Sequence, residues 1–173
     1  LEGGLVPIVE PEVLMDGGHD IDTCYQVTEW VLKETFQQLY YQKVALEGIV
    51  LKPNMAVPGK KSGKKVSVQD VAERTVRMLK NCVPGAVPGI AFLSGGQSDE
   101  EATAHLDAMN KIGNLPWKLT FSYGRPLQAA PQKAWSGKAE NIAAGQRAFT
   151  HRARMNALAS KGDGAWVQVF GGD

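Results

Sequence analysis

Residues 46–54, Leu-Glu-Gly-Ile-Val-Leu-Lys-Pro-Asn, form the stretch on which the fold prediction depends. The unbroken apolar run Ile49-Val50-Leu51 predicts a buried β-strand, placed at Leu46–Leu51, and Lys52 ends it. A lysine at the end of a buried strand loses hydration, which disfavours its ammonium form. A neutral amine attacks carbonyl carbons and forms Schiff bases. The alternative is a structural lysine whose ammonium group reaches back to water.

Three further apolar runs predict strands over Leu5–Val9, Gly89–Leu93 and Trp117–Phe121. Segments with helical periodicity lie between and after the strands: Asp22–Gln42, Val68–Leu79, Ser98–Lys111, Pro126–Trp135 and Lys138–Ser160. Strands that alternate with helices in short steps predict a parallel sheet with right-handed crossovers. Because the strands are almost continuously apolar, we expect both faces of the sheet to be covered.

The ends of the predicted strands favour a barrel over an open sheet. Every strand delivers polar side chains at its carboxyl end, namely Glu10 and Glu12, Lys52, Ser94, then Ser122 and Arg125. A (β/α)₈ barrel assembles its active site from several strand ends, whereas an open sheet binds ligands at one switch point. A full barrel needs eight units in about 250 residues. The 173 residues therefore predict an α/β fold that is half of a (β/α)₈ TIM barrel, its strands 5–8, followed by C-terminal helices.

Two of these strand ends carry signals for phosphate binding. Ser94-Gly95-Gly96 lies between a strand and a helix start, where glycines let backbone N–H groups approach an anion. A plain tight turn is the alternative. Ser122-Tyr123-Gly124-Arg125 ends the next strand and offers a guanidinium group for bidentate phosphate contact. Barrels often bind phosphate in the loops after strands 7 and 8, which these two segments would occupy.

The two glutamates belong to the same predicted pocket. Glu10 and Glu12 are two residues apart, so their side chains share a face of an extended chain. One of them is expected beside Lys52, where a carboxyl group can move protons during Schiff-base formation. The alternative is an ion pair that holds the lysine charged, and it has the same geometry.

Composition excludes several classes of protein. A net charge of +1 gives no support for binding to nucleic acid or to a membrane surface. One basic run, residues 60–65, lies in a Gly/Ser loop and is either a solvated connection or a loop that binds phosphate or another polyanion. Only two cysteines, Cys24 and Cys82, are present, and we expect free thiols in a reducing compartment. Without a signal peptide or an apolar stretch of about 20 residues, a cytoplasmic location is predicted.

Four segments together resemble the class I fructose-bisphosphate aldolases, and they occur in the order of that family. They are Leu-Val-Pro-Ile-Val-Glu-Pro-Glu (5–12), Leu-Glu-Gly-Ile-Val-Leu-Lys-Pro-Asn-Met (46–55), Phe-Leu-Ser-Gly-Gly-Gln-Ser (92–98) and Phe-Ser-Tyr-Gly-Arg (121–125). The similarity covers the C-terminal half of the family's barrel, is greatest to bacterial members, and assigns residues 1–161 to this half-barrel. Residues 162–173 are left as an irregular tail. The resemblance implies a metal-independent lyase of glycolysis and gluconeogenesis, which cleaves fructose 1,6-bisphosphate reversibly into dihydroxyacetone phosphate and glyceraldehyde 3-phosphate.

The resemblance also assigns roles to residues. Lys52 matches the lysine that forms the Schiff base, and Glu10 the glutamate that handles protons during imine formation. Glu12 matches the neighbouring active-site glutamate. The phosphate ligands match Ser94, Gly95, Gly96, Ser122, Gly124 and Arg125. The implied partners are a sugar phosphate, the N-terminal half of the barrel, and further copies in a homo-oligomer.

Three departures from the family and two other functions bear on this assignment. The family's N-terminal half, which completes the pocket, has no counterpart here, and Pro126 stands where alanine is common. Residues 162–173 also differ from the C-terminal tail of the animal enzymes, which ends in a tyrosine. A half-barrel that acts only in assembly or interaction is one alternative function. Another phosphosugar-binding barrel enzyme, such as an isomerase, is the second, although it would need no nucleophilic lysine. A zinc-dependent aldolase is disfavoured because His19, His105 and His151 are far apart in the sequence.

Overall fold

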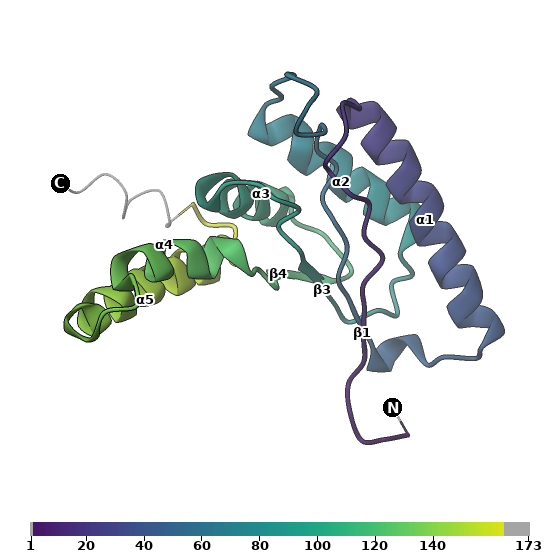
Figure 1. The fold of residues 1–173 in the computed structure, drawn as a ribbon. Helices are drawn as coiled ribbons and strands as arrows, with labels where there is room; N and C mark the ends of the chain where they lie inside the picture. Colours follow the sequence, from purple (N-terminus) through teal and green to yellow (C-terminus); the bar gives the residue numbers. More distant parts are fainter. Residues whose placement is uncertain (1, 165–173) are drawn as a thin grey trace.

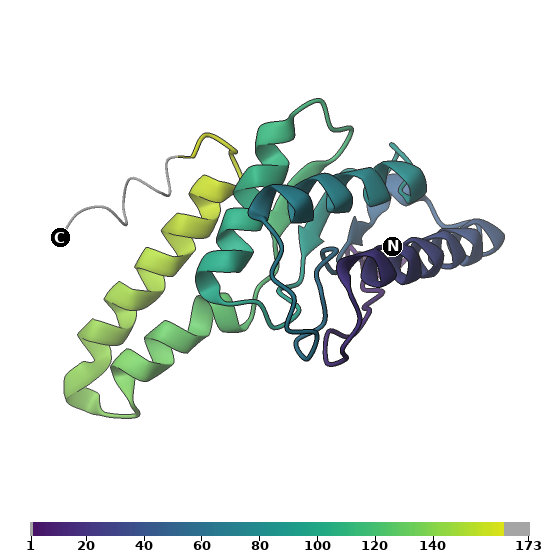
Figure 2. The ribbon, with the colours of Figure 1, turned by 90° about the horizontal axis from the view of Figure 1, so that it is seen from above.

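The computed structural model describes residues 2–164. Four parallel strands form one sheet in chain order: β1 (Ile8–Val9), β2 (Val50–Leu51), β3 (Gly89–Phe92) and β4 (Lys118–Phe121). The helices are α1 (Ile21–Tyr41), α2 (Val68–Cys82), α3 (Asp99–Ile112), α4 (Arg125–Trp135) and α5 (Ile142–Ala159). Figures 1 and 2 show successive helices packed beside one another along the sheet. The predicted parallel sheet of four βα units is confirmed.

Side chains between the sheet and its helices form the core. Leu51, Ile90 and Phe92 on the strands are fully buried. They belong to one apolar cluster with Leu32 of α1, Leu79 of α2 and further helix residues. Burial of this apolar surface is the main term that holds the helices to the sheet.

The helix starts follow from local hydrogen bonds. Ser98 accepts from the backbone N–H of Glu101, and the Glu101 side chain accepts from the Ser98 backbone, which completes a capping box at α3. The helix α4 begins at Arg125, one residue before the predicted start. Pro126 therefore occupies the second helical position, where its missing N–H has no consequence.

Several predicted boundaries were wrong in length. The strand predicted over Leu46–Leu51 is reduced to β2, because Leu46–Gly48 forms a 3₁₀ turn closed by the Ile49 N–H on the Leu46 carbonyl. The strand predicted over Leu5–Val9 pairs only at Ile8–Val9, since it has a strand neighbour on one side alone. The last predicted helix starts as a 3₁₀ turn, Ala139–Asn141, before α5.

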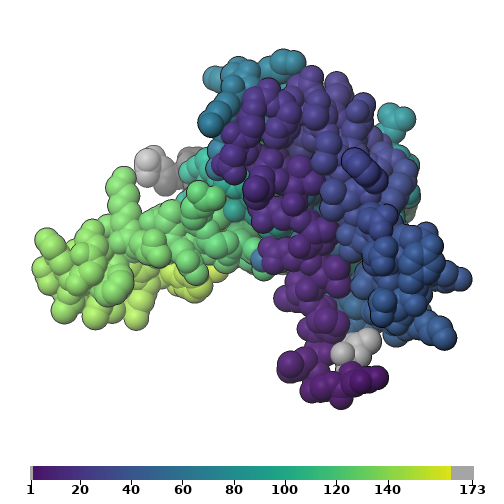
Figure 3. Space-filling view, turned by 45° about the vertical axis from the view of Figure 1, so that its right-hand side comes forward, coloured from purple at the N-terminus to yellow at the C-terminus, as the bar shows by residue number. Residues whose placement is uncertain are grey.

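The sheet of the described residues is open at both edges. The outer strand β1 and the residues just before it expose large apolar side chains, with 77% of Leu5, 67% of Val6 and 58% of Ile8 accessible to solvent. Figure 3 shows this N-terminal stretch on the outside of the molecule and the α4–α5 pair projecting from it. Open strand edges with apolar side chains invite pairing with another chain segment. None of the helices in residues 2–164 is long and apolar enough to cross a membrane.

Asn54 fixes the chain just after β2. Its side chain is 1% exposed, accepts from the Val13 N–H at 3.0 Å, and donates to the Thr28 hydroxyl at 2.9 Å. It also donates to the Met55 carbonyl at 3.2 Å. One buried amide thus ties the end of β2 to the segment after β1 and to α1.

We predict that Asn54→Ala lowers the free energy of unfolding by about 3 kcal/mol, because it leaves the Val13 N–H and the buried Thr28 hydroxyl without these partners. Asn81→Ala is the matched control, since Asn81 is exposed and its side chain donates to the Tyr25 hydroxyl at the surface. Its cost should stay below about 1 kcal/mol. Urea denaturation measures both, and equal losses would contradict the role given to Asn54.

Candidate active site

A cavity of about 330 Å³ lies at the carboxyl ends of the four strands. It is lined by all the residues that the sequence predicted for the site: Glu10, Glu12, Lys52, Ser94, Gly95, Gly96, Ser122, Gly124 and Arg125. Five other residues also line it: Leu14, Met15, Asp16, Lys60 and Leu93. The structure therefore brings together in one pocket residues that are up to 115 positions apart, from Glu10 to Arg125.

Backbone hydrogen bonds between neighbouring strands hold the pocket in register. The Lys52 N–H donates to the Val9 carbonyl at 2.8 Å. One step along the sheet, the Leu93 N–H donates to the Pro53 carbonyl at 3.1 Å, and the Ser122 N–H to the Phe92 carbonyl at 2.9 Å. Because each bond lies at a strand end, the polar residues that follow emerge at the same edge of the sheet.

Lys52 and Glu10 form an ion pair in this pocket, with 2.9 Å between Nζ and Oε1. The side chains are 20% and 44% exposed respectively, so the lysine is the more enclosed of the two. The ammonium group is turned toward a carboxylate rather than into open solvent. At this distance a proton can pass directly between the two groups.

The glycine loop after β3 has the backbone shape of an anion site. Gly95 and Gly96 have φ of 58° and 77°, in the left-handed region that glycine adopts without strain. Successive residues of this kind form a concave turn whose N–H groups point to a common centre. Arg125 comes close to the loop, since a Cβ on Gly96 would lie 3.5 Å from its Nη2.

Side chains behind the loop hold it in place. The Gln97 side chain donates to the Ser94 carbonyl at 2.7 Å and accepts from His105 Nδ1 at 2.5 Å. His105 is 7% exposed, and burial lowers its pKa to about 4. The histidine is therefore neutral at pH 7 and supports the loop through Gln97. Sequence reasoning gave this residue no role.

Two charged residues that line the pocket, Asp16 and Lys60, were not among the predicted site residues. Lys60 begins the basic run 60–65, which was interpreted as a solvated loop or as a polyanion-binding loop. Its Nζ lies 3.8 Å from Asp16 Oδ1, inside the cavity. The residue that could have indicated the position of Lys60 is Gly59, because a glycine lets its loop approach a second loop closely and so fixes the residue that follows it.

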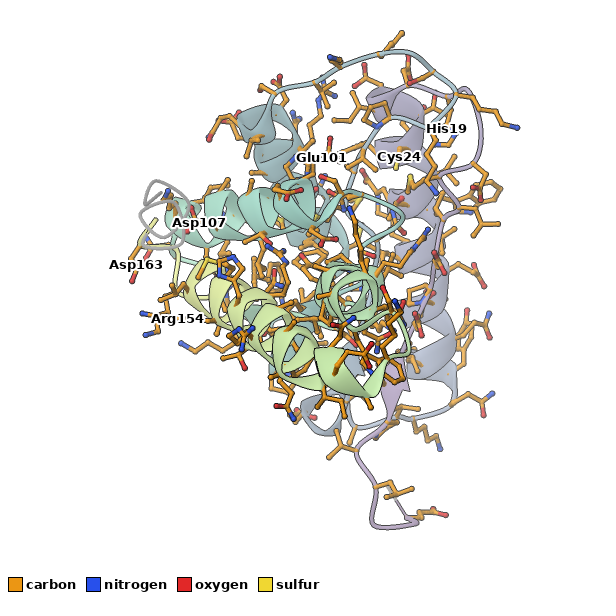
Figure 4. All side chains as sticks on the ribbon, turned by 60° about the vertical axis from the view of Figure 1, so that its left-hand side comes forward. His19, Cys24, Glu101, Asp107, Arg154 and Asp163 are labelled. Atoms are coloured by element: carbon orange, nitrogen blue, oxygen red, sulfur yellow. The ribbon has the colours of Figure 1, made fainter. Side chains whose placement is uncertain are left out.

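The other reactive groups lie away from the pocket. Cys24 and Cys82 are free thiols, as predicted. Desolvation raises the pKa of both, that of Cys82 to about 11. Figure 4 shows Cys24 and His19 together near the start of α1, and neither lines the cavity. Within residues 2–164, no group of three or more His, Cys, Asp and Glu side chains could hold a metal ion.

Comparison with known proteins identifies the family. The family model described as class I fructose-bisphosphate aldolase matches residues 1–168. The chain belongs to this family. Residues 165–173 of the predicted tail lie outside the described residues.

Two curated relatives show the extent of the similarity. A probable fructose-bisphosphate aldolase class 1 from Xanthomonas axonopodis pv. citri is 53% identical over 162 residues, which are 93% of this chain and 48% of that protein. Cytosolic fructose-bisphosphate aldolase 4 from Arabidopsis thaliana is 55% identical over 162 residues, 93% of this chain and 41% of that protein. The chain thus spans about half the length of these relatives. The bacterial and the plant relative are about equally similar to this chain, so these identities do not single out the bacterial members.

A solved structure gives the same result for the fold. The fructose-bisphosphate aldolase of Plasmodium falciparum, in a ternary co-crystal structure, superposes with a TM-score of 0.89 at 51% identity. The superposition covers 91% of this chain and 46% of that chain. The four βα units are therefore half of an aldolase (β/α)₈ barrel, as predicted.

The buried side chain of His105 makes the stability of the fold depend on pH. Its folded pKa of about 4 lies below the ordinary value of 6.5, so the unfolded chain binds more protons between these values. The contribution of neutral His105 is fully present above pH 6.5 and is lost as pH falls toward 4. Over that window we predict a loss of up to about 3 kcal/mol.

His105→Gln keeps a side-chain amide near Gln97 and removes the titrating group, so its stability should fall less between pH 6.5 and 4. Urea denaturation across this pH range measures the difference. If His105→Gln loses as much stability as the parent, His105 is not the titrating group.

Proposed function

We propose that this chain forms the Schiff-base half of an aldolase that reversibly cleaves fructose 1,6-bisphosphate into dihydroxyacetone phosphate and glyceraldehyde 3-phosphate. The observation that carries the proposal is the Lys52–Glu10 pair at 2.9 Å, in the same cavity as a glycine loop and an arginine. The names of the relatives, fructose-bisphosphate aldolases, support it.

The first chemical step is addition of the amine to the ketone. Lys52 gives its proton to Glu10, and the neutral Nζ attacks C2 of the open-chain ketose. The resulting carbinolamine loses its hydroxyl group as water, with Glu10 returning the proton to the leaving oxygen. The product is a protonated imine between Lys52 and C2, and Glu10 is again a carboxylate.

The protonated imine then serves as the electron sink for C–C cleavage. The C3–C4 bond breaks, its electrons enter the imine to form an enamine, and the C4 hydroxyl becomes the aldehyde of glyceraldehyde 3-phosphate. Glu10, now a carboxylate, is placed to take the C4 hydroxyl proton. Protonation of the enamine at C3 and hydrolysis of the imine release dihydroxyacetone phosphate and return Lys52 to its starting state.

The phosphate groups hold the sugar so that its carbonyl faces the lysine. In this proposal one phosphate lies on the Gly95-Gly96 turn and contacts Arg125, with Ser94, Ser122 and Gly124 as further ligands. A charge-assisted contact to guanidinium is stronger than one between neutral groups, and it fixes orientation. Positioning of this kind contributes a large part of the rate of reactions between bound groups. Glu12, on the same cavity wall, is proposed as a second carboxylate of the acid–base system.

The proposed partner is the other half of the barrel. Exposed apolar side chains lie on β1 and just before it, at Leu5, Val6 and Ile8, and this edge is one on which further strands can pair. The length of the relatives, about twice that of this chain, supports eight units in the working enzyme. We further propose a homo-oligomer that acts in the cytosol without a metal, on the basis of the family and of the name of the Arabidopsis relative.

A second candidate function rests on the same open edges. If the remaining strands are never supplied, the chain is an assembly or interaction module that binds phosphate but does not turn over substrate. The two functions differ in one observable, covalent capture of the ketose by Lys52. An isomerase, the third possibility raised by the sequence, would also leave Lys52 unmodified.

We predict that borohydride reduction with dihydroxyacetone phosphate, applied to the full-length protein that its gene encodes, attaches the three-carbon unit to Lys52. Peptide mass mapping locates the adduct. Lys52→Arg keeps the charge and removes the nucleophile, so it should abolish both the adduct and turnover. Phosphate affinity should change less than about threefold, because Arg125 and the glycine turn remain.

Lys61→Arg is the control for lysine replacement, since Lys61 lies in a neighbouring loop but does not line the cavity. The Lys61→Arg variant should form the borohydride-reduced adduct and turn over substrate as the parent protein does. An adduct on another lysine, or none in the parent protein, refutes the Schiff-base proposal and leaves the interaction module or the isomerase.

A further inference from the structure

We propose that Lys60 is an additional ligand of the phosphate held by the glycine turn. When no anion is bound, the Lys60 ammonium group pairs with the Asp16 carboxylate. This inference rests on the proposed function, which places a phosphate at Gly95 and Gly96. It adds to that function a third positively charged group that the family resemblance did not supply.

The position of Lys60 follows from close contact between two loops. The backbone N–H groups of residues 59, 60 and 61 donate to the carbonyls of His19, Met15 and Gly17, at 2.9, 2.8 and 3.0 Å. The loop after β1 and the loop after β2 are thereby joined along three consecutive residues. Lys60 is the middle residue of this contact, so its backbone is fixed beside the pocket.

Gly59 makes this approach possible. A Cβ at residue 59 would lie 2.2 Å from the Gly17 carbonyl oxygen, a distance that no side chain tolerates against backbone. Only glycine lets the two strand-end loops come this close. The glycine therefore sets where the following lysine leaves the backbone, and the basic residue is not free to sample the whole loop surface.

The Lys60 side chain reaches the glycine turn itself. A Cβ built on Gly96 would lie 2.3 Å from both Cε and Nζ of Lys60, and 3.5 Å from Arg125 Nη2. An ammonium and a guanidinium group thus converge on one glycine. The turn at Gly95 and Gly96 lines the same cavity, and its backbone N–H groups are the proposed further donors to the anion.

The charges of the pocket are arranged in two groups. Lys52 is already paired with Glu10 at 2.9 Å. Arg125 makes no ion pair with the described residues, and Lys60 has only a long contact, 3.8 Å, to Asp16, whose side chain is 73% exposed. An exposed ion pair of that length contributes little stability. A phosphate dianion competes with Asp16 at small cost and binds two cations that lack a strong partner.

The other residues of the basic run do not line this cavity. Lys64 is directed to Asp20, with 3.4 Å between Nζ and Oδ2. Lys61 is exposed and does not line the cavity. Of the run 60–65, Lys60 is the residue that lines the cavity, so a specific contact can be distinguished from a general effect of positive charge.

The test is a calorimetric titration of the full-length protein with inorganic phosphate near pH 8, where the dianion predominates. Lys60→Met keeps the aliphatic length and removes the charge, so we expect the dissociation constant to rise about tenfold or more, as for loss of a charged hydrogen bond. Lys61→Met removes the same charge one residue away and should change it less than about twofold. Asp16→Asn removes the competing carboxylate and should lower the dissociation constant.

Arg125→Met separates this inference from the proposed function. If Arg125→Met weakens phosphate binding and Lys60→Met matches Lys61→Met, the phosphate site stands and the assignment of Lys60 is wrong. If phosphate does not bind the parent protein, or binds with no change in either variant, the phosphate site itself is refuted and Lys60 with it. Weaker binding in Asp16→Asn would overturn the part given to Asp16.

Discussion

The parallel register of the four strands is the constraint on which the rest of the structure depends. Each strand end is fixed by one backbone hydrogen bond to its neighbour, and each therefore delivers its next residues to the same edge of the sheet. A slip of one residue would turn Lys52 from the cavity to the helix side. The pocket is thus a consequence of register, and its chemistry follows from the residue that each strand ends on.

The register of the strands alone does not fix the loops that carry the pocket side chains. Hydrogen bonds of buried polar groups hold these loops in place. Asn54 ties the chain after β2 to α1, and the Gln97–His105 pair holds the turn after β3 from behind. Both act through groups that have little contact with water, so their hydrogen bonds are costly to break. They lie one layer behind the residues that would touch substrate, which explains how the loops keep their shape at an open edge.

Sequence reasoning recovered the sheet order and the residues of the pocket because both depend on local pattern. A strand end marked by an apolar run followed by Lys52, or by Ser94 and two glycines, can be recognised from the sequence alone. Strand lengths were overestimated, since pairing at β1 depends on a neighbour that no local pattern reveals. Lys60, Asp16 and His105 were missed because their roles arise from contacts between loops distant in sequence, such as Gly59 against Gly17.

The central claim is that Lys52 forms a covalent bond to the substrate while its phosphate lies on the glycine turn. The most direct measurement is a crystal structure of the full-length protein after exposure to dihydroxyacetone phosphate. We expect continuous electron density from Lys52 Nζ to C2, with the phosphate against Gly95 and Gly96. Substrate bound without a covalent link to Lys52, or with its phosphate elsewhere, would contradict it.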